Sequence, residues 1–524
     1  MILKEAVPFV ILFTIIIGLL VVKKTNLSDI FTIDGFFSVI GIFLGLFVLA
    51  LNLIYTNNYL ITIGPLLVIV CLTYLQHRNK ILTPNTNFSL KLKTEKRKMI
   101  KILYWICITV GLISYYHSPP YYRSPIFFIS MPIGITTIVL EILYSKKDES
   151  ESAKILMKIL IISLLIRNSA YFISPYPVGS DPWGHADFIN DIYTYGSLNV
   201  PLTHTSEYYI DYPIMHIYAA ITCLIGDLNV KNSMSIIGLT IILSTLFVYL
   251  IAKKITKDDT TSLLVILLIN FADFHIRWSI EVIAMTFGIV LFTIVIYIIV
   301  NKDLKNQVIT QTLLVSFVLI IAWTHTISSF ILLISMISLY IGSLLYKLLY
   351  QRDGINTLAC LEKPLIRYNI VVLFSVILMF HWMDPRYAFF EAVTKGIITA
   401  LSHDASFLGR SDQYIAGNFE SILNILGFLI YIALGVIGSL YSLSSVSTDK
   451  IKFSFIFTQV ILFFIFFVFP VFGVKNLVPD RWPAFIYIFF ALFVGLGLIQ
   501  LVNIINKKGQ VLFLLLIIFA SSFF

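Results

Sequence analysis

Residues 179–188, with the sequence GSDPWGHADF, bring two aspartates and a histidine together directly after an apolar run. Asp181 and His185 are four residues apart, so a helix that starts here would place both side chains on one face. A carboxylate or an imidazole held close to a hydroxyl group can take up its proton and so act as a general base. We therefore treat Asp181 and His185 as candidate catalytic residues, and Trp183 between them as a candidate substrate contact.

The residues around Asp181 predict a short surface helix over 182–195. Aspartate is a preferred N-cap and proline is favoured in the first turn, as in Asp181-Pro182, and Gly196 is a typical helix end. Apolar residues follow at helical spacing and define one face of the expected helix: Phe188, Ile189, Ile192 and Tyr195. On this pattern, Asp187 belongs to a solvated face.

A second apolar segment, YPIMHIYAAITCLIG at residues 212–226, lies a short distance further along the chain. With about 15 residues it is shorter than a typical membrane span and is close to the length of interfacial or re-entrant segments. Its Tyr212 and His216 add polar groups at the same membrane depth as Asp181. We count both as candidate substrate contacts.

The elements that must position these residues are membrane helices. The 524 residues are 58% hydrophobic and 12% charged, and the mean hydropathy is +0.92. Soluble domains are about one quarter charged, whereas apolar runs of about 20 residues, long enough to cross a bilayer, recur throughout this chain. The sequence predicts an all-α polytopic membrane protein with about 16 transmembrane helices. Continuous apolar runs disfavour a β-barrel, whose strands alternate.

The net charge of +9 does not indicate a nucleic-acid partner, because the lysines and arginines concentrate in short loops between apolar runs. Basic loops of this kind stay on the cytoplasmic side of a membrane. They fall on one side if residues 212–226 do not cross, and residues 174–233 and 384–420 then form long external loops. We expect a multi-pass protein of the cell membrane with its active site on the external face.

The charged segment KKDESESAK at residues 146–154 is the best internal boundary. It separates an N-terminal extension of about five spans, residues 1–154, from residues 155–524, which contain the candidate catalytic segment.

Further polar residues lie at the expected outer ends of later spans. Residues 270–285 contain Arg277 and Glu281, and the segment WTHTISS contains His325. Arg481 lies at the outer end of a late span, and its guanidinium suits a phosphate group because its forked donors can bind two oxygens at once. We include these four side chains among the candidate substrate contacts.

Two arginines of the later external loop, Arg386 and Arg410, are weaker candidates for the same phosphate.

The sequence SDPWGHADFINDI, followed by YPIMHIYAAITCLIGDLNVKNSMSIIG and a further span, resembles the GT-C superfamily of integral membrane glycosyltransferases. This group includes oligosaccharyltransferase catalytic subunits and protein mannosyltransferases. The resemblance covers roughly residues 155–500. It implies a GT-C-like bundle whose first external loop carries surface helices and an acidic residue, here Asp181.

The resemblance implies that a sugar is moved from a polyprenyl-phosphate carrier to a glycan, lipid or protein acceptor, with inversion. It also implies that Asp181 activates the acceptor, directly or through a divalent cation such as Mg²⁺ or Mn²⁺ that Glu281 would share. The chain departs from the oligosaccharyltransferase pattern at residues 278–281, WSIE, where only Glu281 matches the expected acidic pair. It also has no Trp-Trp-Asp type motif, so a monosaccharide transferase fits better.

Two other functions remain open from the sequence: a transporter or flippase of a lipid-linked saccharide, and a polymerase or ligase of surface polysaccharide. Transporters usually have polar or interrupted spans near the bilayer midplane. In this sequence, most candidate polar groups lie at the outer ends of spans, which favours surface chemistry.

Overall fold

The structure is a computed structural model that describes residues 31–54, 58–83, 93–144, 148–199, 209–301, 307–351, 364–383, 418–471, 481–504 and 507–521. In these residues the secondary structure consists of α-helices and short turns, without a β-strand. The first five described helices are α3 (Ile33–Ile54), α4 (Asn58–Leu82), α5 (Thr94–Tyr116), α6 (Pro125–Tyr144) and α7 (Glu149–Tyr171). The long helix α11 (Val230–Thr256) follows later in the chain.

The remaining helices complete the bundle and the layer that holds the candidate site. They are α8 (Asp181–Tyr195), α10 (Ile214–Gly226), α12 (Asp259–Asn270), α13 (Asp273–Ile280), α14 (Ala284–Val300), α15 (Gln307–Ala322), α16 (Thr326–Gln351), α17 (Tyr368–Trp382), α19 (Asn418–Leu443), α20 (Lys450–Val471), α21 (Pro483–Ile504) and α22 (Lys507–Ser521).

Seven of the described helices are long and apolar enough to cross a membrane, and the bent pair α12–α13 raises this number to eight. Helix α5 illustrates what surrounds them, because Ile102, Trp105, Ile106 and Ile113 are all exposed on its surface. Such a continuous apolar surface suits lipid and not water. The prediction of a helical protein with several membrane spans is therefore confirmed. The figure of about 16 spans stays a prediction, and its first span, residues 7–22, lies outside the described residues.

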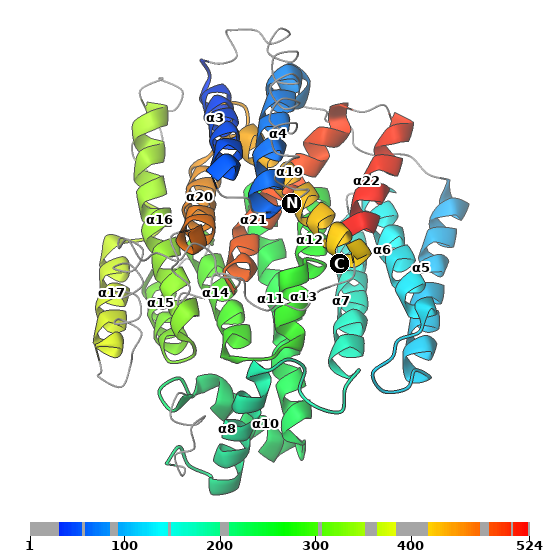
Figure 1. The fold of residues 1–524 in the computed structure, drawn as a ribbon, viewed down its shortest axis with the longest axis vertical. Helices are drawn as coiled ribbons and strands as arrows, with labels where there is room; N and C mark the ends of the chain where they lie inside the picture. The colour runs from blue at the N-terminus through cyan, green and yellow to red at the C-terminus, as the bar shows by residue number, and fades with distance from the viewer. Residues whose placement is uncertain are drawn as a thin grey trace.

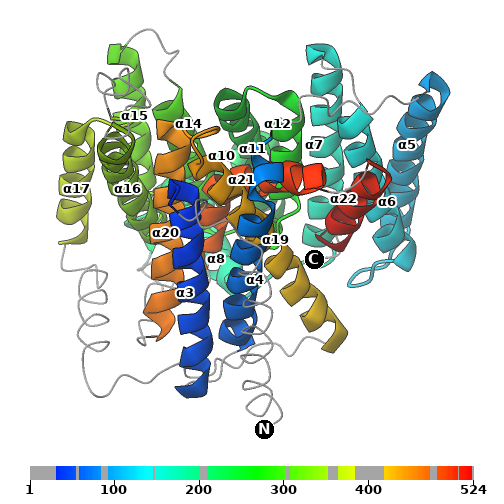
Figure 2. The ribbon, with the colours of Figure 1, turned by 90° about the horizontal axis from the view of Figure 1, so that it is seen from above.

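Helices α8 and α10 form a small layer at one end of the bundle (Figure 1), below α7, α11 and α13 in that view. Helices α5 and α17 lie at opposite edges of the bundle, as the view from above also shows (Figure 2). The small layer has a core of its own between α8, α10 and the start of α11, centred on Phe188, Ile189, Met215 and Met234. The layer is thus held to the bundle by apolar packing.

Helix α8 follows the prediction closely, with two corrections at its ends. Asp181 is its first residue and not its cap; the cap position is Ser180, whose side chain makes no capping hydrogen bond. Gly196 ends the helix in the left-handed conformation at φ +62°. Tyr195 was expected on the apolar face but is exposed, while Asp187 is exposed as expected.

Helix α10 coincides with the predicted interfacial segment. It has 13 residues, packs against α8 and α11, and buries Met215, Ala219 and Cys223. Its opposite side exposes Leu224 and Ile225. One apolar face is therefore buried against protein and the other is left for a nonpolar environment.

The chain bends by 52° between α12 and α13. The sequence prediction treated residues 270–285 as a loop, whereas residues 273–280 form the short helix α13. Its buried side chains His275 and Trp278 face the start of α21 and bring two distant parts of the sequence together.

The predicted division near residue 154 stays a prediction. Helix α7 begins at Glu149, inside the charged segment that was expected to mark the boundary. Side chains of α5 and α6, such as Ile108 and Ile138, share one hydrophobic cluster with α11, α12 and α21.

Candidate functional site

The centre of the candidate site is an ion pair between two residues that are 300 positions apart in the sequence. Arg481 donates through Nη2 to Oδ2 of Asp181 at 2.6 Å. Asp181 lies in the first turn of α8, and Arg481 directly precedes α21. The side chain of Asp181 is 50% exposed and that of Arg481 is 19% exposed. The structure therefore brings the predicted base and the predicted phosphate ligand into direct contact.

Arg481 keeps an unused hydrogen-bond donor. Its Nε is buried, and no partner for this atom occurs among the described residues. The guanidinium lies 5.7 Å from the ring centroid of Trp278 in α13, and that of Arg277 lies 4.9 Å from the same ring. The Nε1 atom of Trp278 is also buried without a partner in the described part of the chain. Two guanidiniums thus flank one indole, and the cluster holds two buried donors without a described partner, a composition that favours an anion.

Glu281 approaches the site from the other side of the loop that precedes α8. Its Oε1 lies 3.2 Å from Nε of Arg277. Arg277 is in the last turn of α13, and Glu281 is the residue that caps this helix. Its side chain also packs on Gly179, where a β-carbon would lie 3.1 Å from Cγ of Glu281. Gly179 has φ +94°, a conformation that favours glycine. The absence of a side chain also allows the backbone to lie close to Glu281.

His185 and His216 form a buried pair under the first turn of α8. Nδ1 of His185 lies 2.8 Å from Nε2 of His216, and Nδ1 of His216 lies 3.2 Å from the carbonyl oxygen of Tyr212. A carbonyl can only accept, so in neutral rings His216 donates to it through Nδ1 and accepts from Nδ1 of His185. Nε2 of His185 then carries the free lone pair, as a proton acceptor requires.

The burial of these rings keeps them neutral. Burial is the largest cause that lowers the pKa of His185 well below its usual value, and the neighbouring His216, His325 and Arg481 add to the effect. Burial likewise lowers the pKa of His216 to about 3, while the hydrogen bond to Tyr212 opposes it. The ring of Tyr209 packs against His185 with centroids 4.2 Å apart and the ring planes tilted by 32°. The pair is therefore an uncharged base with a fixed tautomer.

His325 lies in the turn between α15 and α16, close enough to Arg481 and His185 to influence both electrostatically. Burial lowers its pKa to about 3, with a smaller contribution from Arg481. Its Nδ1 accepts from the backbone N–H of Ser328 at 3.2 Å. His325 therefore lies at the same end of the bundle as Arg481 and His185.

Two predicted substrate contacts pack against other aromatic rings. Trp183 is exposed and stacks on Tyr176, with ring centroids 5.7 Å apart. The Tyr212 ring packs edge-on against His381 of α17 at 5.1 Å, and its backbone carbonyl contacts the histidine pair. The weaker candidates Arg386 and Arg410, with most of the second external loop, lie outside the described residues.

The donor set does not fit a divalent cation well. Each of the two predicted ligands, Asp181 and Glu281, is paired with a guanidinium, and a second cation at the same oxygens would be repelled. No group of three or more His, Cys, Asp or Glu side chains suited to a metal occurs in the described ranges. Metal dependence stays a prediction.

Sequence reasoning missed Trp278, Tyr209 and Gly179. Trp278 had a local signal, because it follows Arg277 at the outer end of a span. Tyr209 and Gly179 had none, since their roles depend on contacts with α8 and Glu281 that the sequence does not encode locally.

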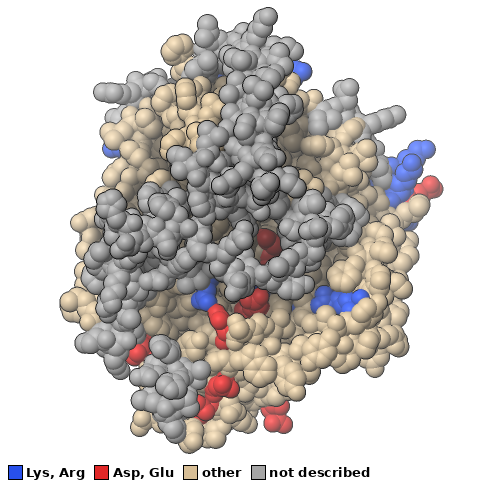
Figure 3. All heavy atoms as spheres, in the orientation of Figure 1, with Lys and Arg blue, Asp and Glu red and all other residues tan. Residues whose placement is uncertain are grey.

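Several acidic side chains appear on the part of the molecule where α8 and α10 lie (Figure 3).

No protein-family model matches the chain, and no curated protein matches it.

Proposed function

We propose that the chain is a membrane glycosyltransferase of the GT-C type, which moves a sugar from a polyprenyl-phosphate carrier to an acceptor on the external face of the cell membrane. The observation that carries this proposal is the contact between Asp181 and Arg481 at 2.6 Å. These residues were selected separately from the sequence, one for the acceptor and one for the carrier phosphate. Their meeting beside a buried histidine pair supports a single reaction centre.

The carrier phosphate and Asp181 compete for Arg481 in the proposed mechanism. A phosphate can take two donors of a guanidinium at once. Its binding would release the carboxylate of Asp181, which is already half exposed. Donor binding thus creates the free base when the sugar is in place.

The acceptor hydroxyl loses its proton to Asp181, and its oxygen forms a bond to the anomeric carbon of the sugar. The bond between that carbon and the phosphate oxygen breaks, and the leaving phosphate keeps the electron pair. Arg481 stabilises the charge that develops on the phosphate, while the lone pair on Nε2 of His185 accepts a hydrogen bond from a second hydroxyl of the acceptor.

Transport of a lipid-linked saccharide is the second candidate, and one group of buried charges favours it. Lys158, near the middle of α7, pairs with Glu141 of α6, and both are buried. Arg167 of α7 is 1% exposed, and its Nε and Nη2 atoms have no partner in the part of the chain that the structure describes. Ionisable groups inside transmembrane helices often mark a transport pathway. Flux of a labelled lipid-linked sugar in proteoliposomes, without transfer to an acceptor, would favour this function.

The proposal is tested with purified protein and a panel of polyprenyl-phosphate hexoses and pentoses that carry tritium in the sugar. We expect wild-type protein to transfer one of them to acceptors in membrane extracts. Asp181→Asn should lower transfer by about 100-fold or more, the usual scale for loss of a general base. The exposed Asp187→Asn in the same helix is the matched control and should keep activity. Full transfer by Asp181→Asn would contradict the assignment.

A further inference from the structure

A cavity lies at the opposite end of α11 from the candidate site. It has a volume of about 420 Å³ and is lined by Leu250, Ile251, Lys253, Lys254 and Lys257 of α11 and its C-cap, with Tyr297, Val300 and Asn301 from the end of α14. Cavities of this size are typical of small-ligand sites. Three lysines and no carboxylate stand among these lining residues.

The cavity is separated from the site by about one membrane thickness. Helix α11 has 27 residues, which corresponds to about 40 Å and to a bilayer with its headgroups. Its first turns lie at the site end: Ser233 donates to the carbonyl of Ala219 in α10, and Gly238 packs closely on the carbonyl of Ser279 in α13. If the site is external, the lysine cavity is at the cytoplasmic interface.

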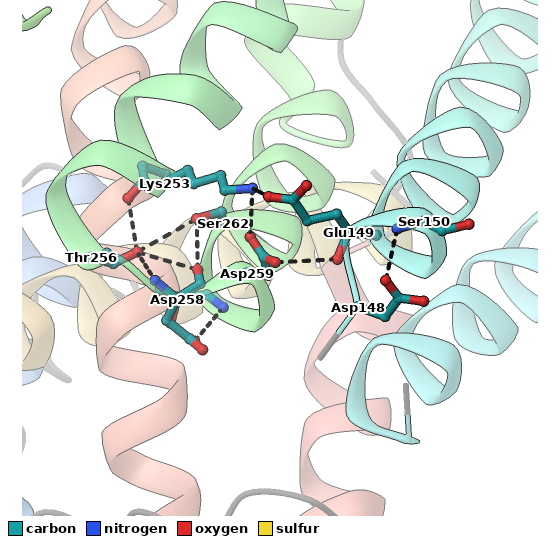
Figure 4. Close-up of polar contacts among 11 residues, drawn as sticks. Asp148, Glu149, Ser150, Lys253, Thr256, Asp258, Asp259 and Ser262 are labelled. Atoms are coloured by element: carbon teal, nitrogen blue, oxygen red, sulfur yellow. Dashed lines mark hydrogen bonds and ion pairs between the residues drawn. The ribbon is translucent and has the colours of Figure 1, made fainter. Parts of the chain in front are cut away.

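The three lysines have different surroundings. Lys253 pairs with Asp259 of α12 at 3.2 Å and approaches Glu149 of α7 at 3.9 Å, so it ties three helices together (Figure 4). Lys257 is exposed and forms the left-handed cap of α11 at φ +55°. Lys253 therefore has a structural role, and Lys254 and Lys257 line the same cavity.

The cavity also continues onto an apolar strip. Leu250 lines it and is 39% exposed, and Leu243 is 58% exposed two turns earlier on the same side of α11. Residues seven apart share a helix face. On the cavity wall, the amide of Asn301 donates to the hydroxyl of Tyr297 at 3.0 Å. The lysines of the cavity suit an anionic group, and the neighbouring apolar strip suits an attached hydrocarbon chain.

We propose that this cavity binds the headgroup of an anionic phospholipid, with Lys254 and Lys257 contacting the phosphate and an acyl chain lying along Leu250 and Leu243. The apolar strip favours a lipid over a soluble phosphate, because a soluble anion gains nothing from exposed leucines. Basic residues at the membrane surface attract anionic lipids by about 1 kcal/mol each. The bound lipid would hold α11 at a fixed depth. This inference is independent of the proposed transferase function.

The test uses full-length protein in detergent and a fluorescent short-chain phosphatidylglycerol, followed by fluorescence anisotropy. We expect it to bind more tightly than phosphatidylcholine with the same label and chains. Lys254→Gln/Lys257→Gln should weaken binding by about 30-fold, which is the two surface contributions combined. The matched control is Lys96→Gln/Lys98→Gln in the first turns of α5, which removes the same charge from two exposed positions and should change binding less than two-fold.

Three results would overturn the proposal. Equal binding of the two lipids would mean that the headgroup charge is not recognised. An equal loss in both double variants would mean that only the total charge matters. Displacement of the lipid by glycerol phosphate at an equal concentration would identify a site for a soluble anion. If the lysine variant does not fold, Leu250→Glu at the exposed strip replaces it, with the same expected loss.

Discussion

Two carboxylate–guanidinium pairs in this protein have the same shortest contact, 2.6 Å, but very different surroundings. Between α3 and α4, Asp34 accepts from Nε and Nη2 of Arg78 and from the hydroxyl of Tyr74. Asp34 is 1% exposed and Arg78 is 8% exposed. Between α8 and α21, Asp181 is half exposed, and Arg481 retains a buried donor without a described partner.

The first pair is closed and the second is open. In the closed pair, both carboxylate oxygens are engaged and little solvent reaches them, so its role is to join two helices. In the open pair, each partner keeps capacity for a further ligand, and the pair stands beside two neutral histidines. A short ion pair therefore does not by itself indicate a functional site. The unused donors and the exposure of its carboxylate distinguish the one we assign to chemistry.

The largest expected difference between the two pairs is in stability. Asp34→Asn leaves Arg78 buried without its charge partner and should lower the free energy of unfolding by about 3–5 kcal/mol. Asp181→Asn breaks a pair that is partly in solvent and should change it by less than about 1 kcal/mol. Thermal unfolding of the detergent-solubilised variants measures both. Similar losses in the two variants would remove the distinction between closed and open pairs.

The histidines beside the open pair predict a loss of stability in acid. Their folded-state pKa values lie below the usual 6.5, at about 3 for His216 and His325. Their contribution is therefore fully present above pH 6.5 and is lost as the pH falls towards 3, because the unfolded chain binds protons first. The unfolding midpoint should fall across this window, and less so in a His216→Gln/His325→Gln variant. Equal acid sensitivity in wild type and variant would refute the neutral assignment.

The smallest expected effect concerns the loop that leads to the open pair. Gly179→Ala adds a β-carbon at φ +94° and 3.1 Å from Glu281, and we expect a cost of about 1–2 kcal/mol. Gly196→Ala, at φ +62° with nothing within 4 Å, is the matched control with backbone strain alone. Sugar transfer should fall in Gly179→Ala only, because Gly179 lies in the loop that leads into α8 and so positions Asp181. Equal transfer by both variants would show that this contact does not position the carboxylate.

The sequence predicted the layer of α8 and α10 well, because local signals define it. Aspartate and proline mark where α8 begins, Gly196 marks its end, and the short apolar run gives α10. The membrane character followed from composition.

Pairings between distant residues could not be predicted in the same way. Nothing in the sequence near Asp181 indicates Arg481 as its partner 300 residues later, and nothing near Asp34 indicates Arg78. Sequence reasoning placed His185 and His216 at one depth but not in contact. The buried charges Glu141, Lys158 and Arg167 were not anticipated either. Such contacts depend on how the helices pack, which apolar periodicity alone does not specify.

The most direct test of the central claim is an exchange of the two charges at the open pair. The double variant Asp181→Arg/Arg481→Asp keeps an ion pair but reverses the positions of the base and the phosphate ligand. Transfer of tritiated sugar from the polyprenyl-phosphate panel is compared with the wild type and with each single variant, alongside thermal unfolding. We predict a folded protein without transfer activity in all three variants. Recovery of transfer in the double variant would show that the pair is only structural, and would contradict our account.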